Sequence, residues 1–272
     1  MWNPNAVFVV CVALLVFALN WPRGGLSALA CAAGLAMPSP AAAVPAALRP
    51  AVEAVAAVEP GQVIGSIGVP GTGKTATVEA ASKHWPRVVV FDPYAARDRQ
   101  RVASGKARRV AWSGELVDVL DLLADPTRLD ASKMRLIVAG SDLSPKALGA
   151  DFSALAELCW STGDLVLVGE EAGLYSRAAV PIIHRIASGG AHAGLSLVLV
   201  SQSLTRLHVD ARRGITLLTC GEQGEAGDVE ALRDRCGRSF AERVRALRGP
   251  EPGIPPSAPL VWRLGEGVKE SA

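Results

Sequence analysis

The sequence is poor in several residue types, and each shortage narrows what the chain can be. Aromatic residues make up only 5% of its 272 residues, so a folded core has to be built mainly from Val, Leu, Ile and Ala. The 28 Lys and Arg residues nearly balance the 26 Asp and Glu residues, which leaves a net charge of +2. This positive charge is too small to indicate nucleic-acid binding by itself. The four histidines share no spacing typical of metal ligands.

Cysteine is also scarce. The five cysteines lie far apart, and none belongs to a C-x-x-C pair. This spacing excludes the usual zinc-binding motifs and provides no disulfide framework. A reduced, cytosolic setting for the main domain is the simplest interpretation. The cysteines are Cys11, Cys31, Cys159, Cys220 and Cys236.

Charge is missing altogether from the start of the chain, where no side chain before Arg23 is charged. Residues 6–19 are unbroken apolar sequence, and Trp2 and Trp21 stand on either side of them. The two tryptophans are separated by about 29 Å of helix, which is close to the hydrocarbon thickness of a bilayer. Tryptophans at both ends and a basic residue directly after the run are typical of a membrane span. We therefore predict a transmembrane anchor over residues 1–23.

Two alternatives to an anchor stay open. No basic residue precedes the run, which argues against a secretory signal peptide, although the Ala-rich sequence after Pro38 resembles a cleavage site. A buried core helix is the second alternative, because the strictly apolar part is shorter than the run of about 18 residues expected of a span. If the chain crosses a membrane once, Arg23 favours a cytosolic main domain with the N-terminus outside.

Residues 24–60 have the composition of a linker. Within them, residues 26–37 form a second apolar stretch, which fits a re-entrant or interfacial segment or the return leg of a hairpin. Prolines among alanines follow up to Pro60, as in a semi-rigid tether. We therefore expect the globular domain at residues 61–248 and a Pro-rich C-terminal tail at residues 249–272.

Short apolar runs alternate with helical patterns from residue 61 onward, without an internal repeat. Strands that are apolar throughout and lie between helices indicate a sheet covered on both faces, and therefore an α/β fold with a mostly parallel central sheet. A helix capped by Asp151 is expected at 151–160, and an edge strand at 260–264. The other expected strands are 63–67, 87–91, 109–112, 135–138, 165–168, 195–200 and 215–219, and the other expected helices are 76–82, 114–123 and 180–187.

One segment carries a phosphate-binding motif, G-x-x-x-x-G-K-[ST], between a predicted strand and a predicted helix. Glycines let such a loop point successive backbone N–H groups at anionic oxygens, and the helix N-terminus adds its dipole. Lys74 would reach the β- and γ-phosphates of ATP, and the Thr75 hydroxyl would hold Mg²⁺. A chance Gly-rich turn is the alternative, but the flanking elements favour phosphate binding. The predicted contacts are Gly68, Val69, Pro70, Gly71, Thr72, Gly73, Lys74, Thr75 and Ala76.

Acidic residues follow the predicted strand 165–168. Carboxylates at the carboxyl end of a strand beside a phosphate loop can hold Mg²⁺ through water and activate the attacking water. The usual pair, Asp-Glu directly after four apolar residues, corresponds here to Gly169-Glu170, whereas a shift by one residue gives Glu170-Glu171. Glu170 takes part in both registers, as the catalytic acid in the first and as the metal-side acid in the second. A solvated acidic loop is the alternative to both.

Gln202 follows another buried strand, at 195–200. A polar residue at this place can sense the γ-phosphate and align the attacking water. We therefore predict Glu170, Glu171 and Gln202 as the catalytic set, with Thr75 and Glu170 holding Mg²⁺. A simple strand-end amide is the alternative for Gln202.

Together these segments resemble the FtsK/HerA superfamily of DNA-pumping ATPases. The resemblance rests on residues 165–170, on Ile186-Ala187-Ser188-Gly189-Gly190-Ala191-His192-Ala193-Gly194-Leu195-Ser196 and on Val200-Ser201-Gln202, and it covers roughly residues 61–237. It implies a RecA-like P-loop NTPase fold, ATP hydrolysis and a homo-oligomeric ring, usually a hexamer. The small size and single phosphate loop resemble genome-packaging ATPases of bacteriophages with an internal membrane.

The turn before Gly194 departs from the family's pattern. It commonly carries an arginine, and this chain has Ala191 there. An arginine that acts on the neighbouring subunit must then come from elsewhere, and surface solvation is the alternative for every candidate. The candidates are Arg185, Arg206, Arg212 and Arg213.

Two basic stretches are candidates for contacts with DNA phosphates. A solvated face is the alternative for both, and more so for the second, whose spacing is nearly helical and includes Glu242. The first stretch contains Arg97, Arg99, Arg101, Lys106, Arg108 and Arg109, and the second contains Arg233, Arg235, Arg238, Arg243, Arg245 and Arg248.

The combination predicts a membrane-anchored ATPase that moves double-stranded DNA, as in phage genome packaging, at the host inner membrane or a virion's internal membrane. A zonula-occludens-toxin-like assembly ATPase of filamentous phages, which extrudes single-stranded DNA, is the first alternative, although that family usually has its membrane span after the ATPase domain. A conjugative coupling ATPase is another, although those chains are typically much longer. A nucleotide-binding scaffold that barely hydrolyses also stays open, because the Asp of the usual acidic pair is missing.

Overall fold

The computed structural model describes residues 44–85, 87–94, 107–111, 135–139, 142–249 and 257–265. The predicted anchor at 1–23, the predicted helix at 114–123 and most of the first basic stretch lie outside these ranges. Among the residues that are described, no helix has the length and apolar character needed to cross a membrane.

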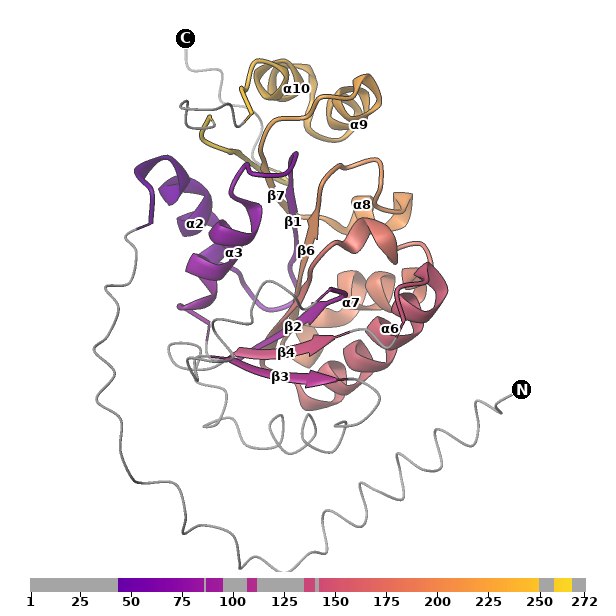
Figure 1. Ribbon diagram of the computed structural model, residues 1–272. Coiled ribbons are helices and arrows are strands. Elements are labelled where there is room, and N and C mark those ends of the chain that lie inside the picture. The colour runs from indigo at the N-terminus through magenta and orange to yellow at the C-terminus, as the bar shows by residue number, and fades with distance from the viewer. Residues whose placement is uncertain are drawn as a thin grey trace, which may run out of the picture. The chain divides into compact units, whose positions relative to one another are not determined.

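The short apolar runs of the sequence form the strands of one sheet (Figure 1). Strands β1 to β7 all pair in parallel, and β8 pairs antiparallel with β7 at one edge. The predicted α/β fold with a mostly parallel sheet is thereby confirmed, as is the predicted edge strand. The strands are β1 Val63–Ile67, β2 Val88–Asp92, β3 Ala107–Ala111, β4 Arg135–Ala139, β5 Leu165–Gly169, β6 Leu195–Ser201, β7 Leu217–Cys220 and β8 Leu260–Arg263.

The order of the strands differs from their order along the chain. In the sheet they run β3-β4-β2-β5-β6-β1-β7-β8. Strand β6 therefore lies between β1 and β5, with Ile67 beside Ser201 and Gly169 beside Leu199. Since parallel strands end at the same edge, the residues that follow β1, β5 and β6 are brought together there.

Helices cover both faces of the sheet, because every residue of β1, β2, β5, β6 and β7 is buried and each face needs an apolar partner. One face packs against α2 and α3, and the other against α6 to α10 (Figure 1). The α-helices are α2 Arg49–Ala56, α3 Lys74–Ser82, α6 Pro145–Thr162, α7 Val180–Ala193, α8 Val209–Gly214, α9 Ala226–Cys236 and α10 Arg238–Arg245, with short 3₁₀ turns η1 at Ala46–Leu48 and η3 at Ala172–Leu174.

The boundary predicted near Gly61 is wrong, because the folded unit begins at Val44. The Pro-containing segment that was interpreted as a tether instead forms η1 and α2, which pack on the same face as α3. Val52 and Val55 are buried there. The prolines misled the prediction because proline is well tolerated in the first turn of a helix, where Pro50 stands.

Two helix boundaries also differ from the prediction. Helix α6 begins at Pro145 rather than at Asp151, because Ser144 caps it by accepting a hydrogen bond from the backbone N–H of Ala147 at 3.3 Å. Asp151 is a buried residue within the helix and not its cap. Helix α7 continues to Ala193, beyond the predicted end at 187, and stops at Gly194, which takes the left-handed conformation with φ 64°.

Candidate nucleotide site

The phosphate-binding motif forms a tight loop between β1 and α3. Gly68 and Gly73 have φ values of 149° and 84°, which side-chain-bearing residues rarely adopt. A Cβ atom on Gly68 would also lie 2.6 Å from the Thr72 hydroxyl oxygen. The Thr72 hydroxyl in turn donates to the carbonyl of Val69 at 2.9 Å. The glycines of the motif are therefore required by the curvature of the loop itself.

Lys74 is the first residue of α3, and its side chain turns back over the loop. The ammonium Nζ donates to the carbonyls of Gly68 at 2.6 Å and Val69 at 3.0 Å. This geometry holds a positive charge beside backbone N–H groups at a helix N-terminus, and such a combination binds phosphate oxygens.

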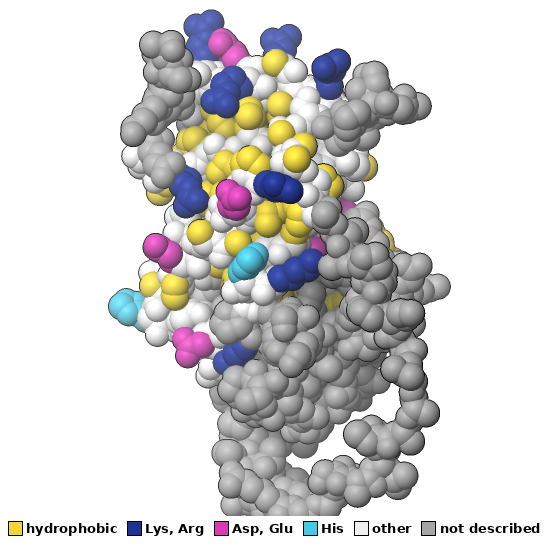
Figure 2. Space-filling model, turned by 90° about the vertical axis from the view of Figure 1, so that its left-hand side faces the viewer, with side chains coloured by type: hydrophobic (Ala, Val, Ile, Leu, Met, Phe, Trp, Pro, Cys, Tyr) yellow, Lys and Arg dark blue, Asp and Glu magenta, His cyan; other side chains and the backbone are white. Residues whose placement is uncertain are grey.

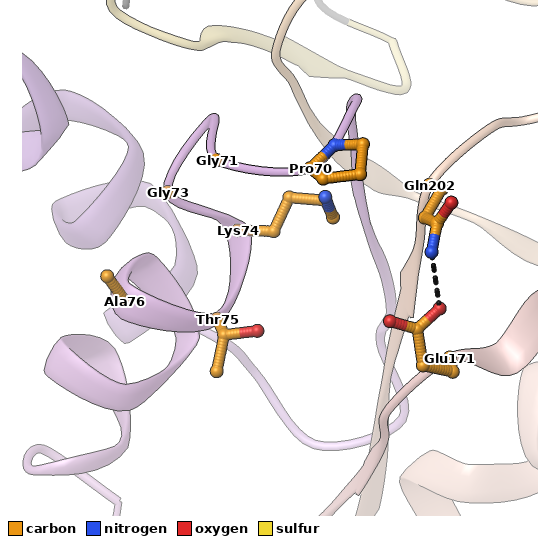
Figure 3. A pocket seen from close by; sticks show the side chains of 8 residues that line it. All are labelled: Pro70, Gly71, Gly73, Lys74, Thr75, Ala76, Glu171 and Gln202. Atoms are coloured by element: carbon orange, nitrogen blue, oxygen red, sulfur yellow. Dashed lines mark hydrogen bonds between the residues drawn. The ribbon is translucent and has the colours of Figure 1, made fainter. Parts of the chain in front are cut away.

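A pocket of about 280 Å³ opens beside Lys74. The loop and the start of α3 form one side of it, and residues from the ends of β5 and β6 form the other (Figure 3). The predicted groups Glu171 and Gln202 face each other there, and the Gln202 amide Nε2 donates to Glu171 Oε2 at 3.2 Å (Figure 3). The lining residues are Pro70, Gly71, Gly73, Lys74, Thr75, Ala76, Glu171 and Gln202.

The two acidic residues after β5 occupy different places. Glu170 is buried, and its Oε2 accepts a hydrogen bond from the Thr75 hydroxyl at 3.3 Å. Glu171 takes the left-handed backbone conformation with φ 49° and lines the pocket. This geometry favours the second of the two registers, with Glu170 on the metal side and Glu171 on the water side. The left-handed residue lets two consecutive side chains reach the same site.

The oxygens of Thr75 and Glu170 fit a Mg²⁺ ion. Mg²⁺ prefers oxygen ligands, retains several waters and binds through one or two protein groups together with substrate phosphates. The hydroxyl of Thr75 and the carboxylate of Glu170 lie 3.3 Å apart at the edge of the phosphate loop, which is such an arrangement. In the part of the chain that is described, no cluster of three or more His, Cys, Asp or Glu residues could hold a metal by itself.

The connection between β7 and α9, which no sequence motif assigned to the site, packs against the phosphate loop. The Val69 backbone N–H donates to the carbonyl of Glu222 at 3.1 Å. The Thr72 side chain would lie 2.7 Å from a Cβ on Gly221, so these two loops are in close contact. Gln223, which is also buried, donates to the backbone carbonyl of Gln202 at 3.5 Å. The glycines that flank Glu222 and Gln223 were the only sequence signal for this role.

An aromatic cluster lies beside Gly169, the residue before the two acidic residues. Tyr175 packs edge-on against Phe91 with ring centroids 5.2 Å apart, and it lies 4.9 Å from Phe152. Burial raises the pKa of Tyr175 well above its ordinary value, and the nearby carboxylates, with Glu170 first among them, raise it further. Among the described residues, the Tyr175 hydroxyl has no hydrogen-bond partner. Three of the few aromatic residues are therefore packed together beside the end of β5 that carries the acidic residues.

Three of the four candidate arginines for a neighbouring subunit bind groups of their own chain. Arg185 pairs with Glu157 at 2.7 Å and also stacks on Trp160. Arg213 lies 3.7 Å from Asp210. Arg206 donates to the amide oxygen of Gln202 at 3.4 Å, which places it at the rim of the pocket of this same chain. The fourth candidate, Arg212, lies in α8.

The second basic stretch lies on α9, α10 and the residues that follow. Arg233 and Arg238 pair with acidic residues of their own helices. Arg235 donates to the backbone carbonyls of Arg213 and Ile215 and stacks on Trp262. Figure 2 shows the side of the molecule that carries α2 and α3, and Lys and Arg side chains gather at its upper end. Figure 1 shows α10 at the same height. Part of this stretch is therefore structural, and Arg243, Arg245 and Arg248 are exposed.

No protein-family model and no curated protein matches the sequence. Several solved structures match its fold. The DNA-packaging ATPase B204 from Sulfolobus turreted icosahedral virus has a TM-score of 0.52 at 18% identity, over 70% of this chain and 90% of that one. The genome-packaging NTPase B204 from Sulfolobus turreted icosahedral virus 2, in complex with ATP-γS, gives the same values. VirB4 of Thermoanaerobacter pseudethanolicus has a TM-score of 0.52 at 12% identity, over 74% and 88%.

The chain has the fold of these ATPases. The resemblance to FtsK/HerA-type ATPases that the sequence predicted is thereby confirmed at the level of the fold. Identities of 18% and 12% establish the fold alone, and a fold does not determine an activity, which depends on the residues of the site.

Proposed function

We propose that the chain is an ATP hydrolase that moves double-stranded DNA, and that residues 1–23 anchor it in a membrane. One observation carries the enzymatic part: the phosphate loop faces Glu171 and Gln202 across a single pocket. The fold similarity to B204, a DNA-packaging ATPase, supports DNA as the polymer that is moved and genome packaging as the process.

Each group around the pocket has a chemical task in hydrolysis. The backbone N–H groups of the loop and the Lys74 ammonium bind phosphate oxygens and stabilise the charge that develops during transfer. The Glu171 carboxylate orients the attacking water and accepts its proton. The Gln202 amide aligns that water with the γ-phosphate. Mg²⁺, when bound by Thr75 and Glu170, neutralises phosphate charge.

Phosphate release from ATP by the full-length chain tests the enzymatic part. We expect turnover that depends on Mg²⁺. A chain that binds an ATP analogue but shows no turnover above background would support the nucleotide-binding scaffold instead.

Stimulation by DNA tests the proposed polymer. A protein that holds duplex through its phosphates should be stimulated by double-stranded DNA of any sequence, and the stimulation should fall steeply with salt. Stimulation by single-stranded DNA alone, at equal nucleotide concentration, would instead favour the filamentous-phage assembly ATPase. The described domain has few aromatic platforms for stacking on single strands, which supports duplex.

Charge reversal locates the DNA contact. Reversal of Arg97, Arg99 and Arg101, which lie outside the described residues, should weaken stimulation by duplex and leave basal hydrolysis near normal. A matched control reverses three exposed cations elsewhere on the described surface. These are Lys83, Lys146 and Arg177. Equal loss of stimulation in both triple variants would indicate a general charge effect and no local contact.

Membrane anchoring rests on the sequence of residues 1–23. The full-length protein should pellet with membranes and resist extraction by high salt, because hydrophobic insertion is not screened by ions. A variant that lacks residues 1–43 should stay in the supernatant. Release of the full-length protein by salt or an alkaline wash would indicate peripheral binding instead.

A homo-oligomeric ring, with a hexamer as the expected size, is the last part of the proposal. It follows from the resemblance to FtsK/HerA-type ATPases. Light scattering of the full-length protein with a non-hydrolysable ATP analogue should give the mass of a ring, and a monomer under these conditions would contradict it.

A further inference from the structure

A buried carboxylate outside the pocket holds the loop that follows Gln202. Asp228 lies in the first turn of α9 and is only 2% exposed. Its Oδ1 atom accepts hydrogen bonds from the Ser203 hydroxyl at 2.6 Å, from the Thr205 hydroxyl at 2.7 Å and from the Thr205 backbone N–H at 2.9 Å. Hydrogen bonds to an ionised acceptor are short and stronger than neutral ones. Three of them on one atom define the position of this loop.

The bonds act on the residues directly after a pocket residue. Ser203 directly follows Gln202, and Ser201 directly precedes it. The Ser201 hydroxyl donates to the Ser203 carbonyl at 2.9 Å. The carbonyl of Gln202 itself accepts from Gln223. Gln223 lies between β7 and α9, and Asp228 lies in the first turn of α9. Together they hold the backbone at Gln202 and directly after it.

The orientation of the Gln202 amide depends on the same loop. Its oxygen accepts from Arg206, and its nitrogen donates to Glu171. Arg206 is the residue after Thr205, so the loop bound by Asp228 also carries the group that orients the amide. A displaced loop would move both the backbone and the amide partner of Gln202.

Burial of a carboxylate is costly unless it is fully hydrogen-bonded. Here the three bonds all hold one short loop at the rim of the pocket. We propose that Asp228 is a positioning residue for ATP hydrolysis, which acts through Ser203 and Thr205 to place the Gln202 amide against Glu171. This inference rests on the proposed hydrolase function, and the experiment below separates the two.

The test compares Asp228→Asn with wild type in the full-length protein. Asn has the same shape but lacks the charge that strengthens the three bonds. We expect kcat to fall by about tenfold, because a small misplacement of a catalytic group has effects of that order or larger, while KM and the affinity for an ATP analogue stay near the wild-type values.

A second pair of variants addresses the loop and does not change the carboxylate. Thr205→Val removes the hydroxyl and keeps the volume, and it should lower kcat in the same way. Thr205→Ser restores a hydroxyl and should return kcat towards the wild-type value. If Asp228→Asn fails to fold, this pair still decides the question, since wild-type kcat in Thr205→Val would overturn the inference.

A Gln202→Ala background distinguishes positioning from general destabilisation. If Asp228 acts through Gln202, Asp228→Asn should cause no further loss of kcat in that background. An equal loss with and without Gln202 would overturn the inference, as would an unchanged kcat in Asp228→Asn beside an active wild type. If the wild type itself shows no turnover, the proposed hydrolase function fails, and this inference fails with it.

Discussion

The two sides of the nucleotide pocket are built in different ways. The phosphate side is a run of consecutive residues, 68–76, in which glycines and a helix N-terminus present backbone N–H groups. The hydrolytic side consists of single side chains, Glu171 and Gln202, which follow β5 and β6. They face the phosphate loop because β6 lies beside β1 in the sheet, although β1 is far from both strands in the chain. The first depends on local backbone conformation, and the second depends on the strand order of the whole sheet.

This difference predicts different responses to mutation. On the phosphate side, each group is covalently linked to the next, and the loop is also supported by Glu222 and by Leu48, whose side chain lies about 3.0 Å from the Cβ position of Gly73. On the hydrolytic side, the orientation of each group depends on hydrogen bonds to other side chains. Substitutions there should change turnover more than nucleotide binding.

The largest effect is expected for Glu171→Gln. The change removes the carboxylate that we propose accepts the proton and keeps its shape, so turnover should fall by about a hundredfold or more while ATP-analogue affinity is retained. Glu170→Gln is the matched comparison, because the geometry places Glu170 on the metal side. It should raise the Mg²⁺ concentration needed for half-maximal turnover. A more damaging Glu170→Gln, with an unchanged Mg²⁺ requirement, would support the other register.

The next effect is expected for Lys74→Ala on the phosphate side. Loss of the ammonium beside the loop carbonyls removes charge stabilisation of the phosphates, so turnover should fall at least about tenfold and nucleotide affinity should fall with it. Lys83→Ala is the control, since Lys83 follows the same helix and is exposed. Hydrolysis that survives Lys74→Ala unchanged would contradict the role of this pocket.

Removal of η1 and α2 tests how far the phosphate side depends on packing. The buried side chains of Leu48, Val52 and Val55 each contribute about 1.5–3 kcal/mol by burial. A variant that lacks residues 1–60 should therefore unfold at a clearly lower temperature than one that lacks residues 1–43, as measured by calorimetry. Equal melting temperatures would show that the segment contributes nothing to the folded unit.

The smallest effect is expected for Tyr175, which lies beside Gly169 at the end of β5. The Tyr175 hydroxyl is fully buried without a partner among the described residues, and its raised pKa keeps it neutral. Tyr175→Phe removes an unsatisfied polar group, so the free energy of unfolding should rise by about 1 kcal/mol. Tyr94→Phe, at an exposed position, should leave it unchanged. A destabilised Tyr175→Phe protein would mean that the hydroxyl has a partner, such as a buried water.

Much of the fold could be predicted from hydrophobic pattern. Strand β5 and its neighbours β2 and β6 are buried throughout because helices cover both faces of the sheet, and their mostly apolar sequences can be recognised without a structure. The start of the domain could not be predicted, because the small apolar residues of α2 among prolines look like a linker until the partner face is known. The cap of α6 was missed for a related reason, since Asp151 is a plausible cap by residue type alone.

The sequence by itself determined the phosphate side of the site, since the conformation of residues 68–76 depends on their own glycines and on a lysine at the start of a helix. It also restricted the hydrolytic groups to Glu170, Glu171 and Gln202. Only the tertiary structure decided which carboxylate faces the pocket and which meets Thr75. The physical reason is that these roles depend on strand order, on one left-handed residue and on contacts with Gln223 and Asp228, which are remote in sequence.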